Sequence, residues 1–164
     1  MMDVIAMVSL HDSLKEWLIT LGQENGYEAW TPDTKDNVEF SKVRNIKIDY
    51  RPDVVWRSKR TKLKVFFELA FQEGFRQVIG EVFLASLVEG FNKIFIIRPT
   101  GREDFWKNIE NFLRLAFKKD GIFANYKAFR PRFIIFERNL EEKQEEDKIK
   151  EKITQALKNE KWIK

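Results

Sequence analysis

The sequence has 164 residues, a length that fits one domain, and 43% of them are hydrophobic, which is enough to fill a core. It contains no cysteine, which excludes a disulfide framework, thiolate metal ligands and a cysteine nucleophile. Charged residues make up 34% and are mainly lysine and glutamate, a weak sign of a thermophilic source. No apolar run approaches the roughly 20 residues that span a bilayer, and residues 1–10 lack the basic flank of a signal peptide, so we expect a cytoplasmic protein without a membrane segment.

The predicted elements follow from hydrophobic spacing and from turn and cap residues. They are a helix over 11–26 capped by Asp12 or Ser13, a short strand over 27–30, an extended segment over 38–48, strands over 53–57 and 64–71, a helix over 74–89, a strand over 92–97, a helix over 102–119, a strand over 132–137 and a charged helix over about 140–162. The segments 38–48, 53–57 and 64–71 are expected to form a three-strand antiparallel meander. Helical crossovers then add further strands, which predicts an α/β fold with a mixed sheet flanked by helices. We find no linker or repeat, so residues 1–164 are read as a single domain.

The net charge of +4 is unevenly distributed along the chain. Residues 1–36 have an excess of five acidic side chains, whereas residues 37–76 have an excess of five basic ones. Residues 77–139 have an excess of four basic side chains, and residues 140–164 are balanced. The positive charge in the middle of the chain could attract a polyanion such as DNA, although a solvated lysine-rich surface explains it equally well.

Several kinds of active site are excluded by residue counts. The chain has one histidine, His11, so sites with two or more histidine ligands cannot form. A Ser–His–Asp triad would have to use His11, which has no nucleophile elbow beside it in the sequence. The seven glycines are scattered and form no phosphate-binding loop. Carboxylate chemistry therefore remains.

Two acidic residues stand where a hydrophobic pattern would not place them. Asp53 opens a strand directly after Pro52, which cannot donate to a strand ladder. Glu68 lies within an apolar strand, between Phe67 and Leu69, where an unpaired charge would be costly. A tight turn makes the two strands neighbours, so the two carboxylates can converge if they share a face. Such a pair offers the oxygen ligands that Mg²⁺ or Mn²⁺ prefers.

Pro52-Asp53, a hairpin turn, Glu68 in an apolar strand and then a helix resemble the motif of the PD-(D/E)XK nuclease superfamily. This superfamily includes restriction endonucleases, archaeal Holliday-junction resolvases and repair nucleases. Its core runs helix, three-strand meander, helix, strand, and residues 11–97 match that order. The segment 76–81, which contains Gln77, also looks like the helix that follows the motif in several branches, where a glutamine or similar residue faces the site.

The resemblance implies a restriction endonuclease-like fold and a Mg²⁺- or Mn²⁺-dependent nuclease that hydrolyses phosphodiester bonds in DNA. It implies Asp53 and Glu68 as catalytic metal ligands. In some branches an acidic residue of the first helix joins them, and Glu16 is the candidate here. Homodimers are frequent among relatives of this fold, so a homodimer is expected by analogy only.

The sequence departs from the family motif at Ala70. The family has a lysine at this position, two residues after the acid, and residues 68 and 70 of a strand point to the same face. Gln72, next on that face, and Arg76, just beyond it, are the candidate catalytic residues that would replace the lysine. A shifted register would instead make Glu73 a further ligand. A third reading is that catalysis has been lost.

Basic residues cluster in the predicted turn between the two strands. They are Arg57, Lys59, Arg60 and Lys62, and we interpret them as candidate contacts to DNA phosphates, with a solvated turn as the alternative. Glu68 could also be a structural acid paired with Arg57, Lys64 or Arg76. The leading hypothesis is thus a DNA nuclease. The alternatives are a catalytically inactive module of the same fold that binds DNA or a protein, and an assembly subunit that uses its acidic N-terminal third and its C-terminal helix.

Overall fold

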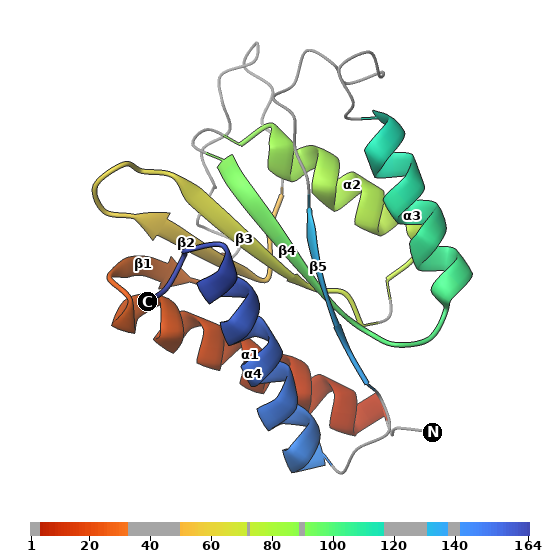
Figure 1. Ribbon diagram of the computed structural model, residues 1–164, viewed down its shortest axis with the longest axis horizontal. Helices are drawn as coiled ribbons and strands as arrows, with labels where there is room; N and C mark the ends of the chain where they lie inside the picture. Colours follow the sequence, from red (N-terminus) through yellow and green to blue (C-terminus); the bar gives the residue numbers. More distant parts are fainter. Residues whose placement is uncertain (1–3, 33–49, 72, 89–90, 117–130, 138–141) are drawn as a thin grey trace.

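The computed structural model describes residues 4–32, 50–71, 73–88, 91–116, 131–137 and 142–164, with side chains for all of these except residues 4–9 and 142–144. Along the chain lie α1 (Val4–Glu24), β1 (Tyr27–Trp30), β2 (Val54–Ser58), β3 (Lys64–Leu69), α2 (Phe75–Ser86), β4 (Phe91–Pro99), α3 (Glu103–Ala116), β5 (Arg132–Phe136) and α4 (Glu142–Asn159) (Figure 1). Within this part of the chain, no helix is both long enough and apolar enough to cross a membrane.

The strands form one five-stranded mixed sheet in the order β1-β2-β3-β4-β5. The first three strands are antiparallel, and β3, β4 and β5 are parallel. The parallel pairs require crossover connections, and α2 and α3 provide them. The predicted mixed α/β sheet with flanking helices is therefore confirmed.

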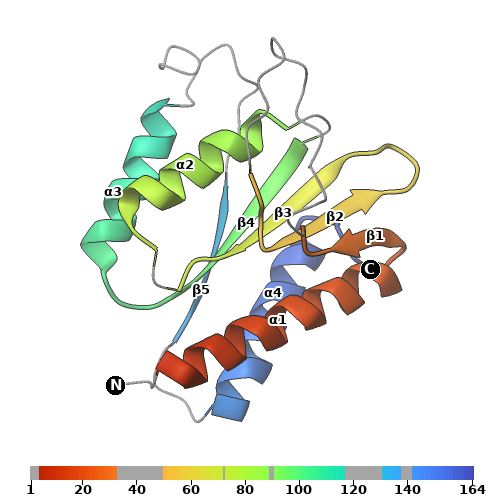
Figure 2. The same cartoon turned by 180° about the vertical axis from the view of Figure 1, so that it is seen from behind.

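The four helices cover the two faces of the sheet in pairs. Helices α1 and α4 lie on one face and α2 and α3 on the other, as the two opposite views show (Figures 1 and 2). Side chains of β3 alternate between the two cores, with Phe67 packed on the α1–α4 side and Phe66 on the α2–α3 side. Because both faces are covered, β3 is buried along its whole length.

Helix α1 begins earlier than its sequence pattern predicted. It starts at Val4, so Asp12 and Ser13 lie inside the helix and the predicted caps are wrong. The apolar stripe of Leu14 and Leu18 extends back by one turn to Leu10, which is also buried. Ser13 donates a hydrogen bond to Glu146 Oε1 of α4 at 2.6 Å instead of capping a helix end. The longer helix carries His11 and Lys15 toward the end of the sheet where β2 begins.

The strand that pairs with β2 on the side away from β3 is β1. Residues Tyr27–Trp30 pair with β2, with Trp30 opposite Val55. The predicted extended segment 38–48 lies outside the described residues. Gly22 lets α1 pack closely on β2, because a side chain at this position would overlap the indole of Trp56. Trp56 is fully buried, as expected for a core residue.

The charged C-terminal helix packs on the domain. Its apolar residues Ile149, Ile153 and Leu157 are buried in the core shared with α1. Near its end, Glu160 forms ion pairs with Lys93 and Arg132, which lie at the beginnings of β4 and β5. The C-terminal end of α4 therefore lies at the end of the sheet where the parallel strands begin.

Candidate functional site

Asp53 and Glu68 come together at the end of the sheet where β2 begins and β3 ends. The last described pair of the β2–β3 ladder is Val54 opposite Phe67, so Asp53 and Glu68 are the next residues along the two strands. The Asp53 carboxylate accepts a hydrogen bond through Oδ2 from the backbone N–H of Leu69 at 2.8 Å. The acid that precedes β2 is thereby attached to β3.

Glu68 is buried on the α2–α3 side of the sheet, with 6% of its surface exposed. The hydroxyl of Tyr50 donates a hydrogen bond to its Oε1 at 2.6 Å. The backbone N–H of Asp53 also donates to the Glu68 carboxylate. The Glu68 carboxyl group is thus held by a buried tyrosine and a backbone amide, and not by the basic residue proposed as its structural partner.

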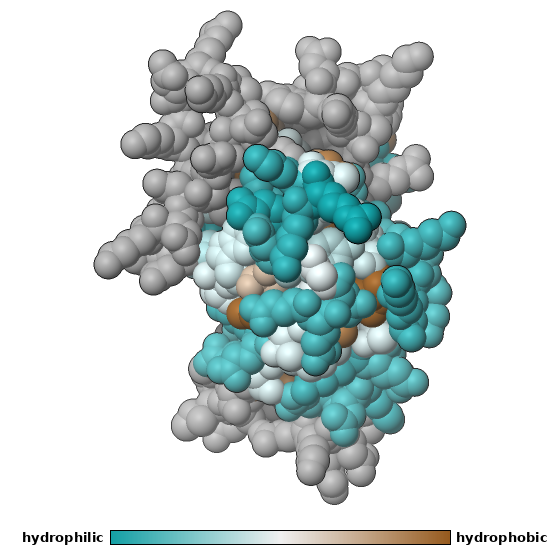
Figure 3. Space-filling view, turned by 90° about the vertical axis from the view of Figure 1, so that its left-hand side faces the viewer, coloured by the Kyte–Doolittle hydropathy of each residue, from teal (hydrophilic) through white to brown (hydrophobic). Residues whose placement is uncertain are grey.

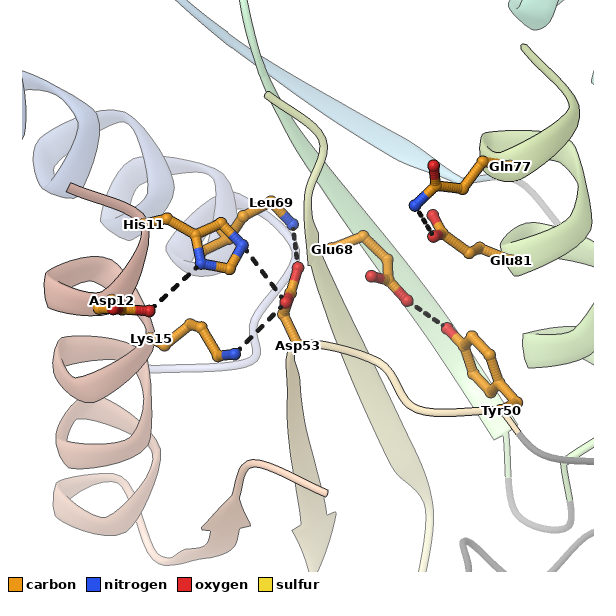
Figure 4. A network of polar contacts seen from close by, with 9 residues as sticks. All are labelled: His11, Asp12, Lys15, Tyr50, Asp53, Glu68, Leu69, Gln77 and Glu81. Carbon is orange, nitrogen blue, oxygen red and sulfur yellow. Dashed lines mark hydrogen bonds and ion pairs between the residues drawn. The ribbon is translucent and has the colours of Figure 1, made fainter. Parts of the chain in front are cut away.

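Two basic side chains of α1 contact Asp53 from the other side. His11 and Lys15 are one helical turn apart and therefore point the same way. His11 Nε2 lies 3.4 Å and Lys15 Nζ 3.6 Å from Asp53 Oδ1. Figure 4 shows Asp53 between these two side chains and Glu68, so that the cations and the second carboxylate lie on opposite sides of it.

Helix α2 brings a third carboxylate near the pair. Glu81 is half-buried and accepts a hydrogen bond through Oε1 from Gln77 Nε2 at 3.1 Å (Figure 4). Its charge raises the pKa of both Glu68 and Tyr50, so it acts on the same site. Gln77 belongs to the helix segment that was expected to face the site, and it reaches the site through Glu81.

The surroundings of Asp53 favour its ionised form. Burial alone would raise the pKa of Asp53, but hydrogen bonds from His11 and the Leu69 N–H, together with the charges of His11 and Lys15, lower it below its usual value. The hydrogen bond with Asp53 in turn raises the pKa of His11, outweighing the opposite effects of burial and of the Lys15 charge. Asp53 is therefore an anion at neutral pH.

The surroundings of Glu68 favour its protonated form. Burial, followed by the charges of Glu81 and Asp53, raises the pKa of Glu68 well above its usual value, and the hydrogen bonds from Tyr50 and the Asp53 N–H only partly offset this. Burial also raises the pKa of Glu81 to about 7, with further increases from the charges of Glu73 and Asp53. The site thus combines one stable carboxylate with two acids that resist ionisation.

Two of the other predicted site residues, Glu16 and Arg76, have exposed side chains. Glu16 is exposed and lies 100° around the helix from Lys15, so α1 reaches Asp53 through different residues than expected. Arg76 is exposed at the start of α2, and Gln72 lies outside the described residues. In the described part of the chain, no three His, Cys, Asp or Glu side chains lie close enough together to hold a metal ion, so the predicted three-carboxylate shell is not formed there.

Ala70, at the position of the motif lysine, lies in an apolar environment. It is 1% exposed and belongs to the core with Val78 and Trp106. Its N–H donates to Ile97 O at 2.9 Å, which places it beside Arg98 on β4. The guanidinium of Arg98 lies over the Trp106 ring, donates to Pro99 O and pairs with Glu103. These partners hold it away from Asp53 and Glu68.

The basic turn lies at the far end of the β2–β3 hairpin. Lys59, Arg60 and Lys62 are exposed there. The β2–β3 turn lies on the left of Figure 1, the side that faces the viewer in Figure 3, where the described surface is mostly hydrophilic. Arg57 forms an ion pair with Glu28 of β1 and lies over the Trp30 ring. The five residues of β2 span about 16 Å between this turn and Asp53. The basic turn is therefore separate from the carboxylate site.

Four residues of the site were not found by sequence reasoning, namely His11, Lys15, Tyr50 and Glu81. His11 and Lys15 have the i, i+4 spacing of one helix face, which is a local signal, but nothing in the sequence indicates what that face meets. Tyr50 and Glu81 give no local signal. Comparison of the chain with models of protein families, with curated proteins and with solved structures finds no match.

Proposed function

We propose that this chain is a metal-dependent nuclease with a restriction endonuclease-like fold, which hydrolyses phosphodiester bonds in DNA at Asp53 and Glu68. The observation that carries the proposal is the reciprocal link between these acids. Asp53 accepts a hydrogen bond from the Leu69 N–H, and its own N–H donates to Glu68. Two carboxylates from adjacent strands are thus held at one end of the sheet.

The arrangement of elements supports the same proposal. The helix, three-strand meander, helix and strand expected from the PD-(D/E)XK resemblance correspond to α1, β1-β2-β3, α2 and β4. Asp53 directly precedes the second strand of this meander and Glu68 lies on the third, and these are the strands that carry the motif acids in that superfamily. The strand end is also where open sheets with parallel strands commonly bind ligands.

The donor set fits a small hard cation. Mg²⁺ is commonly bound by one or two carboxylates, with water and substrate phosphates completing its shell. Burial, followed by the like charges of Glu81 and Asp53, raises the pKa of Glu68, and a divalent cation held by Asp53 and Glu68 would relieve the repulsion between the charges. When bound, such an ion would activate water and stabilise charge on the phosphate.

The residues around the pair would position it for this task. Tyr50 fixes one oxygen of Glu68 by a hydrogen bond, and the Leu69 N–H fixes one oxygen of Asp53. His11 favours the ionised form of Asp53, which is the form that binds a cation. The basic turn lies about 16 Å from the acids, a distance that corresponds to about five base pairs along duplex DNA. Lys59, Arg60 and Lys62 could therefore contact the same duplex.

The test is cleavage of plasmid, single-stranded and branched DNA with Mg²⁺ or Mn²⁺. We expect Asp53→Asn and Glu68→Gln each to reduce cleavage by about 10²-fold or more, because each removes a charged ligand. Glu16→Gln serves as the matched acid-to-amide control on an exposed site and should retain activity. Thermal unfolding of each variant checks that the fold is retained. Activity that survives the double substitution of Asp53 and Glu68 would sink the assignment.

A second candidate is a module of the same fold that binds DNA or a protein without hydrolysis. Ala70 favours it, and so do the existing partners of both acids, since His11 and Tyr50 satisfy Asp53 and Glu68 without an ion. This module would bind DNA in a salt-sensitive way and would show no Mn²⁺ affinity. Calorimetry with Mn²⁺ separates the candidates, because binding that is lost in Glu68→Gln argues for a working metal site. Absence of DNA binding at low salt would favour a protein partner.

A further inference from the structure

Lys15, like His11, lies against Asp53 Oδ1, whereas the arginines near this end of the sheet do not. Its ammonium lies 3.6 Å from Asp53 Oδ1, and 23% of its side chain is exposed. This distance is longer than the 2.7–2.9 Å typical of a charge-assisted hydrogen bond. An ammonium has three donors, so it can turn one toward a second acceptor while remaining close to Asp53.

Two arginines near this end of the sheet are held by other partners. Arg98, beside Ala70, is 2% exposed and is held by Trp106 and Pro99 O. Arg102 donates to the backbone oxygen of Glu73 and lies over the Phe105 ring at 3.8 Å. Lys15 is the lysine that the described contacts place against a site carboxylate while leaving part of its side chain in solvent.

We propose that Lys15 contacts the scissile phosphate and supplies the cation that Ala70 does not provide, a role that depends on the proposed nuclease function. Hydrolysis of a phosphodiester increases negative charge on the phosphate, and Asp53, Glu68 and Glu81 make this region acidic. A fixed cation beside the ion-binding carboxylates would stabilise that charge. The Leu69 N–H fixes Asp53, and the ion pair with Asp53 limits where the Lys15 ammonium can lie.

The experiment compares Lys15→Ala and Lys15→Arg in the full chain, with Lys158→Ala as the control on the exposed end of α4. We expect Lys15→Ala to lower kcat by about 10²-fold with little change in KM, because the contact strengthens in the transition state. Lys15→Arg should recover part of the rate, since arginine also donates to phosphate. Lys158→Ala should behave like the wild type.

Mn²⁺ calorimetry separates this role from a structural one. A lysine that contacts phosphate repels the ion slightly, so Lys15→Ala should bind Mn²⁺ as tightly as the wild type or more tightly. A lysine that only orients Asp53 would give weaker Mn²⁺ binding when removed, in proportion to the lost rate. That parallel loss, or an arginine variant no better than alanine, would overturn the proposal.

DNA binding decides the question if the wild-type chain does not cleave DNA, a result that would count against the proposed function itself. The affinity for a labelled duplex is then measured by fluorescence anisotropy over a range of salt concentrations. A phosphate contact predicts that Lys15→Ala weakens binding and lowers the slope of log affinity against log salt by about one unit. An unchanged slope would show that Lys15 does not contact phosphate.

Discussion

The hydrogen bond from the Leu69 N–H to Asp53 Oδ2, at 2.8 Å, ties the residue before β2 to the strand that carries Glu68. The bond leaves Asp53 between the cations of α1 and the acids near α2 (Figure 4). The pKa of Asp53 is lowered, because its contacts with His11, the Leu69 N–H and Lys15 outweigh its burial, while the pKa of Glu68 is raised by burial and then by the charges of Glu81 and Asp53. Pairs of acids with pKa values pushed in opposite directions are typical of functional sites.

The single histidine allows the link between α1 and Asp53 to be measured directly. We expect His11 to titrate above its usual value of 6.5, because the hydrogen bond with Asp53 stabilises the imidazolium. Asp53→Asn should lower the His11 pKa, since the raising hydrogen bond and charge are removed. NMR titration of the one imidazole signal gives both values. Asp12→Asn is the matched control, with a smaller effect because Asp12 is the weakest contributor to the shift.

The free energy of unfolding should fall as the pH rises from 5 to 8 when divalent metal ions are absent. Glu81 has a usual pKa of 4.5 and a folded pKa of about 7, so the folded state binds more protons than the unfolded state between these values. Glu68 acts in the same direction, and His11 contributes stability below pH 6.5 that is lost as the pH rises through its folded pKa. Thermal unfolding should show Tm falling by about 2–4 °C for each kcal/mol lost.

The contribution of Glu81 can be isolated by substitution. Glu81→Gln should flatten the decline between pH 5 and 7, because an amide does not titrate. The exposed residue Glu151 provides a matched control, and Glu151→Gln should retain the wild-type slope. A Glu81→Gln protein whose Tm declines as steeply as that of the wild type would contradict the assigned role of this acid.

Removal of the Tyr50 hydroxyl should destabilise the chain and make Glu68 harder to ionise. Tyr50→Phe deletes the donor of a 2.6 Å hydrogen bond to a buried carboxyl group, which typically costs about 1–3 kcal/mol. The bond lowers the pKa of Glu68, so its loss should raise that pKa further. Urea unfolding at pH 7 measures the change in the free energy of unfolding. Tyr27→Phe, which deletes a bond to Trp162 O in a partly exposed position, should cost less.

Two glycines inside helices should respond to alanine with opposite signs. A Cβ on Gly22 would lie 2.5 Å from Trp56 Nε1, so Gly22→Ala should lower the free energy of unfolding by about 1–3 kcal/mol. A Cβ on Gly80 of α2 would meet no atom within 4 Å among the described residues. Gly80→Ala should therefore raise the free energy of unfolding by about 0.5–1 kcal/mol, because glycine weakens helix interiors. Equal effects in chemical unfolding would contradict the close packing at Gly22.

Hydrophobic periodicity is a local property, so the amino-acid pattern predicts the type and order of the described elements. The apolar run of β3 and the spacing of Ile149, Ile153 and Leu157 in α4 predicted a central strand and a packed helix, and both are present. It also singled out Asp53 and Glu68, since an acid in an apolar strand conflicts with its surroundings. The tight turn between the strands made them neighbours before any tertiary contact was known.

The tertiary structure decided which distant segments meet. Strand β1 pairs with β2, and His11 and Lys15 rather than Glu16 contact Asp53. Pairing of strands and clustering of charges depend on contacts between residues far apart in the chain, and helical spacing does not specify what a helix face will contact. The partners of the two carboxylates, and hence their opposite pKa shifts, are therefore set by the packing of α1 and α2 on the two faces of the sheet.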